Sequence, residues 1–358
     1  MDTRADIIKK IEDLTDLEFA VLLCLIAKEN CLIDTPSSTL DDLVKELILI
    51  SRDIFGLSFA VIDCTVDTSL EEFNTTILER RRRPSELLQR EENTNGASQR
   101  NYTDVSTRGH DRNETVNVII AKNYDHISQS IQVQTLEMLR TRRIHTKTAT
   151  YSIPNNFVFI PILASEMRQL SSRLNNHLNE HISISHYHDP SVGFVNLEGD
   201  GSSLVDERGF PSSAAWNSSY TAKLTEKSVV ISEEEINYLR GLIPSVTVST
   251  EVYCYTENII NFLRFNRAVF CGITAPATRQ FHKMVKCLAS LHGVDYAPPS
   301  LVALAAKKIY RHRITVAKPQ KDRSMMYGSD INAVEKILSS ATPDSIVEDV
   351  LAEVEAPL

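Results

Sequence analysis

Several features of common protein classes are absent from the sequence. No stretch approaches the roughly 18 consecutive apolar residues of a membrane-spanning helix, and the best run covers only residues 19–27. The first ten residues, MDTRADIIKK, are too charged for a signal peptide. The six cysteines form no CxxC pair and lie among apolar neighbours, which is typical of reduced core residues. We therefore expect an intracellular protein, cytoplasmic or nuclear, without a membrane segment, a disulfide framework or a zinc ribbon.

The charge of the chain is unevenly distributed. Its 358 residues carry a formal net charge of −9, which argues against a general nucleic-acid binder. Residues 1–79 contain 17 Asp and Glu against 6 Lys and Arg, whereas residues 240–327 contain 4 against 13. Two blocks of opposite charge predict a contact between these segments, either within one chain or between two chains.

The hydrophobic pattern changes along the chain. Residues 31–65 are typical of a strand, a loop, a helix and a strand, and this βαβ unit implies a parallel sheet. Ahead of it, apolar residues at helical spacing fill 7–28. A buried strand at 116–121 precedes an amphipathic helix and a further strand at 155–163. Four helices are predicted later, over 233–242, 251–267, 275–291 and 299–310.

We therefore predict an α/β fold in which a parallel sheet core flanked by helices is followed by a helical domain. The core covers about 1–190 and contains a disordered excursion at 80–115, which begins with the run Arg80–Arg83. A linker or insertion rich in Gly, Ser and Pro covers 191–228. The helical domain covers 229–327, and an acidic amphipathic tail covers 328–358.

Two segments resemble a known family. VNVIIAKNYDHISQSIQVQTLEMLRTRRIHT is similar to the Walker B strand and following helix of AAA+ modules in the MoxR and magnesium-chelatase ATPase-subunit group. Residues 256–314 resemble the helical lid of that group, with its closing His312-Arg313. The resemblance covers about two thirds of the chain and points to a diverged, fungal-type magnesium-chelatase-like branch. It implies an AAA+-like core with a lid, and ATP with magnesium as the cofactors of an active member.

The phosphate loop that this resemblance implies has lost its chemistry. Such a loop needs glycine amides around the phosphates, a lysine for their charge and a hydroxyl for magnesium. CLIDTPSSTLDD stands in its place without glycine or lysine, and Asp34, Asp41 and Asp42 would repel a triphosphate. The positions of the former loop are Asp34, Thr35, Ser37, Ser38 and Thr39.

The other positions that the family uses are altered as well. Lys122 and Asn123 replace the magnesium-binding Asp and the catalytic Glu, yet lysine cannot coordinate a cation and asparagine cannot take a proton from water. Ala164 falls near the sensor of the γ-phosphate, His181 in the segment of the arginine finger, and Pro276 near the lid arginine. We therefore expect neither a catalytic residue nor a cofactor.

The lysine in the Walker B position predicts an internal ion pair. Lys122 at the end of its strand would face the vacated cleft, where a partly buried ammonium needs an acidic partner. Asp34 and Asp63 are the two candidates.

A competing motif is His177-Leu-Asn-Glu-His181, which fits the HxxEH signature of inverted zincins. Its two histidines would bind zinc, its glutamate would act as the base, and Glu251 or Glu257 would complete the ligand set. Five-residue motifs also match by chance, and the family resemblance already explains this helix. The zinc hydrolase therefore stays an alternative.

The basic end of the lid predicts an association surface. Lys307, Lys308, Arg311 and Arg313 have helical spacing and fall mostly within one sector, where they could act together on an acidic surface. The partners expected are a second copy of the chain or an active AAA+ relative, and neither nucleic acid nor a membrane.

These patterns together predict a non-catalytic AAA+-like pseudo-ATPase that serves as an assembly or scaffold subunit. One alternative is a magnesium-chelatase-type ATPase subunit, which would use ATP hydrolysis to drive metal insertion into a tetrapyrrole. The other is the HxxEH zinc hydrolase.

Overall fold

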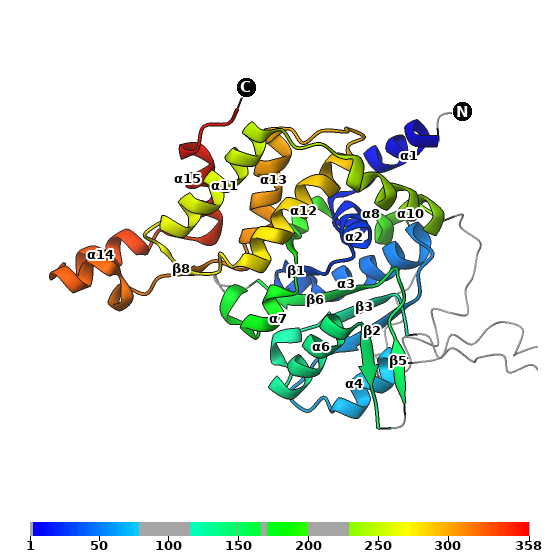
Figure 1. Cartoon of the computed structure of the whole chain (residues 1–358). Helices are drawn as coiled ribbons and strands as arrows, with labels where there is room; N and C mark the ends of the chain where they lie inside the picture. Colours follow the sequence, from blue (N-terminus) through cyan, green and yellow to red (C-terminus); the bar gives the residue numbers. More distant parts are fainter. Residues whose placement is uncertain (1–2, 79–114, 148, 166–169, 200–228, 358) are drawn as a thin grey trace, which may run out of the picture.

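The computed structural model describes residues 3–78, 115–147, 149–165, 170–199 and 229–357 (Figure 1). Within them, a parallel sheet belongs to the first half of the chain and a helical domain, which we call the lid, belongs to the second, as the hydrophobic pattern predicts for a sheet followed by helices. The excursion expected at 80–115, apart from its last residue, lies outside the described residues, and so does most of the linker expected at 191–228.

The central sheet has five parallel strands in the order β2-β3-β6-β1-β7. They are β1 (Cys31–Thr35), β2 (Phe59–Asp63), β3 (Val118–Lys122), β6 (Val158–Ala164) and β7 (Ile184–Tyr187). From β1 the chain continues to the far edge of the sheet at β2, whereas β7 lies on the other side of β1. This reversal beside β1 is the switch point at which open α/β sheets place their ligands, at the carboxyl ends of the strands.

Both faces of the sheet are covered by helices. Successive side chains of a strand point to opposite faces, so Ile33 and Ile120 join one hydrophobic cluster whereas Leu32 and Ile119 join another. The first cluster lies under α2, α3 and the lid, and the second lies under α4, α6 and α7. The helices of this part are α1 (Thr3–Glu12), α2 (Asp16–Ala27), α3 (Leu40–Leu49), α4 (Leu70–Ile77), α6 (Gln129–Thr141), α7 (Asn176–Glu180) and α8 (Val195–Gly199), with a π-helical turn at Ile50–Ile54.

The helical segment predicted over 7–28 is two helices rather than one. Thr15 accepts a hydrogen bond from the Glu18 N–H, and the Glu18 carboxylate accepts one from the Thr15 N–H at 2.8 Å. This capping box starts a new helix, α2, within an otherwise continuous apolar pattern. Ten of the twelve residues of α2 are buried, because the helix packs between the sheet and two lid helices, α10 (Glu233–Leu242) and α12 (Ala275–Leu291).

The lid helices agree closely with the prediction, and three of the four have the predicted bounds. They are α10 (Glu233–Leu242), α11 (Thr250–Phe265), α12 (Ala275–Leu291) and α13 (Pro299–Tyr310), followed by α14 (Ile331–Leu338) and α15 (Pro343–Glu353). Lid residues such as Phe281 and Tyr310 share one hydrophobic cluster with Leu22 of α2 and Ile33 of β1. The sheet and the lid therefore form one continuous core.

The C-terminal segment is part of this core as well. Ile346, Val347 and Val350 of α15 are buried against α11 and α13, so the predicted amphipathic character is used for packing. Helix α14 projects away from the sheet (Figure 1).

The short strands were not predicted. Strand β7 has two adjacent polar residues, Ser185 and His186, and both are nevertheless buried because α13 packs against the strand. Two small antiparallel ladders pair β4 (Arg143–His145) with β5 (Thr150–Ser152) and β8 (Val269–Cys271) with β9 (Thr315–Val316). Within the part of the chain that the structure describes, no helix has the length and apolar character needed to cross a membrane.

Candidate functional site

The carboxyl ends of the parallel strands meet at one edge of the sheet, which we call the carboxyl edge. The register places Asp63 of β2 beside Lys122 of β3, and Asp34 of β1 beside Tyr187 of β7. The former phosphate loop begins with the last two residues of β1, Asp34 and Thr35, and continues into a 3-10 turn at Ser37–Thr39. The two sets of positions that the resemblance relates to nucleotide binding, residues 34–39 and residues 122–123, therefore lie at the same edge of the sheet.

Asp34 is engaged by the lid. Its carboxylate accepts two hydrogen bonds from the guanidinium of Arg311, at 2.5 and 2.8 Å, and its side chain is 1% exposed. Arg311 follows α13 and also reaches Asp344 of α15 at 3.3 Å. Burial opposes the charge of Arg311, but its bonds to Asp34 outweigh burial and raise its pKa. The sheet, the lid and the C-terminal helix thus meet in one ion-pair network.

Lys122 lies between two carboxylates. Its ammonium donates to Asp41 at 2.5 Å and lies 3.8 Å from Asp63. The predicted internal pairing of Lys122 therefore exists, and Asp63 takes part in it. The expectation for Asp34 is wrong, because Arg311 occupies that carboxylate. Asn123 follows in the left-handed conformation (φ 52°) and donates to Asp63 at 3.4 Å.

A third ion pair covers the end of β6. Arg173 donates to the carbonyl oxygen of Ala164 and to the carboxylate of Asp125, and both charged side chains are at most 15% exposed. Ala164 stands where the resemblance places the sensor of the γ-phosphate. It could offer a ligand only its backbone oxygen, and that oxygen already accepts a hydrogen bond from Arg173.

The hydroxyls of the former phosphate loop are also engaged. Thr35 Oγ1 lies 2.8 Å from Thr39 Oγ1 and donates to the His188 carbonyl oxygen at 3.2 Å. Ser37 and Ser38 are exposed on the turn between them. The two threonine hydroxyls of the loop are therefore bonded within the chain, whereas Ser37 and Ser38 face solvent.

Two more basic groups lie at the end of β7. The Lys308 ammonium is 3.2 Å from His186 Nδ1, and His186 is 5% exposed. Burial, together with the charges of Lys308, His188 and Arg311, lowers the pKa of His186 to about 3. Burial likewise lowers the pKa of Lys308. His186 is therefore neutral at physiological pH.

The predicted basic surface of the lid faces largely inward. Arg313 is 5% exposed and donates to the Ile182 carbonyl oxygen at 2.5 Å, and the side chain of Arg311 is 18% exposed and bound in the network described above. Only Lys307 is well exposed, where it pairs with Glu348 at 3.2 Å. The interpretation of these residues as one partner-facing surface is wrong for Arg311 and Arg313. The acidic and basic blocks meet within one chain.

The HxxEH residues do not assemble into a metal site. His177 is exposed on the single turn of α7, whereas Glu257 lies on α11 and is 3.0 Å from His282. No group of three or more His, Cys, Asp or Glu side chains suited to a metal ion occurs among the residues that the structure describes. His181 ends α7, and Pro276 lies in the first turn of α12.

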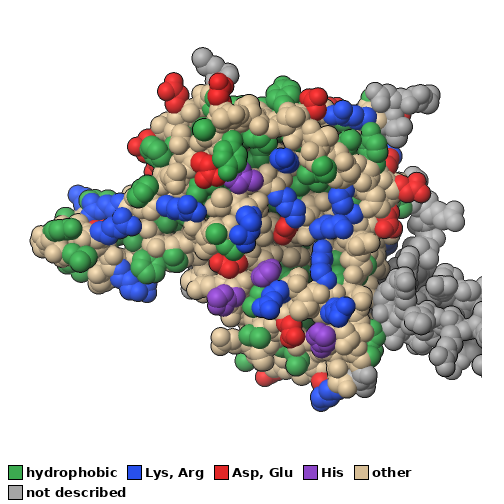
Figure 2. All heavy atoms as spheres, viewed as in Figure 1, with side chains coloured by type: hydrophobic (Ala, Val, Ile, Leu, Met, Phe, Trp, Pro, Cys, Tyr) green, Lys and Arg blue, Asp and Glu red, His purple; other side chains and the backbone are tan. Residues whose placement is uncertain are grey.

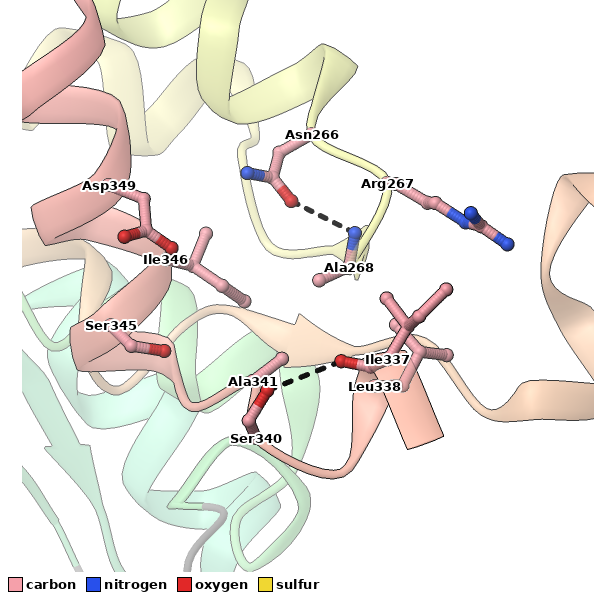
Figure 3. A pocket seen from close by; sticks show the side chains of 10 residues that line it. All are labelled: Asn266, Arg267, Ala268, Ile337, Leu338, Ser340, Ala341, Ser345, Ile346 and Asp349. Carbon is pink, nitrogen blue, oxygen red and sulfur yellow. Dashed lines mark hydrogen bonds between the residues drawn. The ribbon is translucent and has the colours of Figure 1, made fainter. Parts of the chain in front are cut away.

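A pocket of about 440 Å³ lies elsewhere, between the loop before β8 and the two C-terminal helices (Figure 3). Apolar side chains of Ile337, Leu338 and Ile346 line it, with Asp349 at one side. Arg267 at its rim is held by Asp322 at 2.8 and 3.1 Å. This pocket contains none of the residues predicted to bind a ligand.

The comparison with solved structures agrees with this architecture. The chain is similar to a protein of Cytophaga hutchinsonii that is provisionally assigned as an ATPase, with a TM-score of 0.59 and 14% identity over 99% of this chain and 96% of that one. No protein-family model matches the sequence, and no curated protein matches it. The chain therefore shares the fold of this neighbour, and the predicted α/β class, a parallel sheet flanked by helices and followed by a helical domain, is confirmed.

Sequence reasoning missed the cations that close the edge. Arg311 and Arg173 were not assigned to Asp34 and Asp125, and Asp41 was not assigned to Lys122. One signal was present: Asp34 is a charged residue in an otherwise apolar strand, and a buried carboxylate requires a cation. The identity of that cation depends on how the lid docks.

We expect the Asp34–Arg311 pair to be strongly coupled. Asp34→Asn and Arg311→Met should each lower the free energy of unfolding by about 3–5 kcal/mol, because each leaves a buried group without its partner. The double variant should lose less than the sum, by about 1.5–3 kcal/mol. Urea unfolding of the four proteins measures this coupling.

The exposed pair of Glu71 and Lys147 provides the matched control. The cycle of Glu71→Gln and Lys147→Gln should show no measurable coupling, since water screens this pair. Losses at Asp34 and Arg311 that simply add would show that the buried pair does not hold the lid.

We also expect acid sensitivity from His186. Its pKa of about 3 in the folded protein lies below the ~6.5 of an unfolded histidine, so the unfolded chain binds more protons between these values. Stability should therefore fall as the pH is lowered from about 6.5. His186→Asn should reduce the loss of unfolding free energy between pH 7 and pH 5, whereas His177→Asn on the surface should not. Equal losses in His186→Asn and the wild type would contradict this assignment.

Proposed function

We propose that this chain is a non-catalytic subunit of the MoxR or magnesium-chelatase-like AAA+ type, a pseudo-ATPase that acts in assembly or as a scaffold. The observation that carries the proposal is the closure of the carboxyl edge by three internal ion pairs. They are Asp34–Arg311, Lys122–Asp41 and Arg173–Asp125.

The residues at this edge do not fit a nucleoside triphosphate. The arginines that could neutralise phosphates are already bound to Asp34 and Asp125, and releasing either one would leave a carboxylate without its cation. Incoming phosphates would also meet Asp41 and Asp63, and like charges at such distances repel strongly.

The residues do not fit a magnesium ion either. Two carboxylates that could bind one, Asp41 and Asp63, face the ammonium of Lys122 instead. A covalently attached positive charge thus stands between carboxylates where a divalent cation would need them free. No hydrolytic step can be written for this arrangement.

A group of exposed apolar side chains at and near the projecting helix α14 supports a role in assembly. Phe265, Phe270, Met326, Tyr327 and Ile337 are 52–89% exposed there, which is unusual for side chains of this size. Lys321 lies 4.8 Å over the Phe270 ring, so the apolar surface has a basic rim. Such a surface suits a partner with an apolar centre and acidic surroundings.

The test of the pseudo-ATPase proposal is nucleotide binding and turnover. We expect ATP with magnesium to bind at the carboxyl edge more weakly than about 1 mM and hydrolysis to stay at background, because the phosphate-binding groups are absent or paired. Isothermal titration calorimetry and a phosphate-release assay measure both. A micromolar dissociation constant at this edge, or turnover that Lys122→Ala abolishes and Lys307→Ala leaves intact, would favour the active ATPase subunit.

The test of the assembly role is sedimentation. We expect the chain to associate with a second copy, or with an active AAA+ relative, in a way that weakens as salt screens the basic rim. Met326→Ser with Tyr327→Ser should weaken association, whereas Val66→Ser with Val133→Ser, also exposed, should not. A monomer at low salt, with no AAA+ relative co-sedimenting, would contradict a scaffold role.

A further inference from the structure

Four cationic side chains gather at the opposite edge of the sheet, where the strands begin. They come from different elements: Lys28 follows α2, Arg142 follows α6, Arg240 belongs to α10, and Lys283 belongs to α12. We call these four residues the amino-edge cluster. It shares no residue with the carboxyl edge.

The two arginines of the cluster contact Asn156 and Phe157, the residues directly before β6. Arg240 donates to Asn156 Oδ1 at 3.0 Å and to the Leu25 carbonyl oxygen, at the end of α2, at 2.9 Å. The guanidinium carbon of Arg142 lies 5.9 Å from the centroid of the Phe157 ring. Both guanidinium groups are therefore placed by the fold at the start of one strand.

Few acidic groups balance this charge. Glu29 faces the cluster but is bound to Lys283 at 2.5 Å and to Gln280 at 3.4 Å, and Glu233 faces Arg240 from the surface of α10. Neither the Lys28 ammonium nor the Arg142 guanidinium has an acceptor among the described residues. The Lys28 ammonium and the Arg142 guanidinium thus have no bonded carboxylate among the described residues, although the charge of Glu29 acts on Arg142.

The like charges affect one another. Burial, followed by the charges of Arg240, Arg142 and Lys283, lowers the pKa of Lys28. Burial also lowers the pKa of Arg142 and of Arg240. An anion placed among these groups would relieve the repulsion and gain three or four charge-assisted contacts.

The backbone at two of these residues is unusual. Lys28 and Arg142 have φ values of 53° and 56°, and Asn123 is the only other non-glycine residue of the described ranges with positive φ. Helices often end with a residue in this left-handed conformation, and glycine adopts it most easily. A residue with a side chain adopts it at a conformational cost on the order of 1 kcal/mol. At both helix ends, therefore, the strained position projects a cation into the cluster.

We propose that the amino-edge cluster binds a compact anion with several negative charges, of the pyrophosphate or oligophosphate class. Arginine forks and lysine ammonium groups are the side chains that recognise phosphate oxygens. Compactness follows because Arg142 and Arg240 are half-buried and because the net charge of −9 repels a long polyanion. Figure 2 shows Lys and Arg side chains in a band over the middle of the face on which α2 and α12 lie.

The experiment is a calorimetric titration of the full chain with pyrophosphate and with tripolyphosphate, at low salt and again at high salt. We expect binding that strengthens from pyrophosphate to tripolyphosphate and weakens with salt. Arg142→Gln should weaken it about tenfold or more and Lys28→Gln several-fold, since each removes one charge-assisted contact. Lys307→Gln and Lys147→Gln, which remove the same charge elsewhere on the surface, should leave it unchanged.

A second readout is the pKa of Lys28, followed by NMR of labelled lysine. It should rise when tripolyphosphate binds, because the anion favours the charged ammonium. No rise, no binding at millimolar concentration, or equal binding by Arg142→Gln and wild type would overturn the proposal. Tighter binding of an acidic peptide or of single-stranded DNA than of tripolyphosphate would overturn it in favour of a macromolecular interface.

The test of anion binding at the amino-edge cluster can fail or succeed independently of the test of the pseudo-ATPase proposal. ATP could reach the amino-edge cluster through its phosphates alone, and that binding should disappear in Arg142→Gln. ATP binding that persists in Arg142→Gln belongs to the carboxyl edge and counts against the pseudo-ATPase, whatever the cluster does.

Discussion

The buried carboxylate of Asp34 sets the arrangement of the whole molecule. A carboxylate with 1% exposure inside an apolar strand is tolerable only beside a cation, and Arg311 of the lid supplies it with two hydrogen bonds. The lid must therefore dock where Arg311 reaches β1. Asp344 then draws α15 to the same arginine. One electrostatic requirement thus joins the sheet, the lid and the C-terminal helix.

The same requirement bears on ligand binding at the carboxyl edge, which is the basis of the proposed non-catalytic role. In an open α/β sheet the carboxyl edge is the natural ligand site, and here it is satisfied from within by arginine and lysine side chains. The opposite edge has the reverse character, because Lys28 and Arg142 have no bonded carboxylate among the described residues. The anion site that we propose therefore lies at that edge.

How far the sequence predicts this structure depends on the range of the interactions involved. Helices α12 and α13 follow from local periodicity and were predicted to the residue, and the parallel strands follow from short apolar runs. The break at Thr15 was missed because a capping box acts within four residues and the apolar pattern runs through it. Strand β7 was missed because its burial depends on α13. An internal ion pair of Lys122 was predicted, and Asp63 was one of the two partners named. The nearer partner, Asp41, was not predicted, since it approaches Lys122 from α3.

The most direct measurement is a crystal structure of the protein grown with millimolar ATP and magnesium. We expect that Arg311 still binds Asp34, that Lys122 still lies between Asp41 and Asp63, and that no nucleotide lies at the ends of β1 and β3. Triphosphate density between Thr35 and Lys122, with Arg311 withdrawn from Asp34, would contradict it.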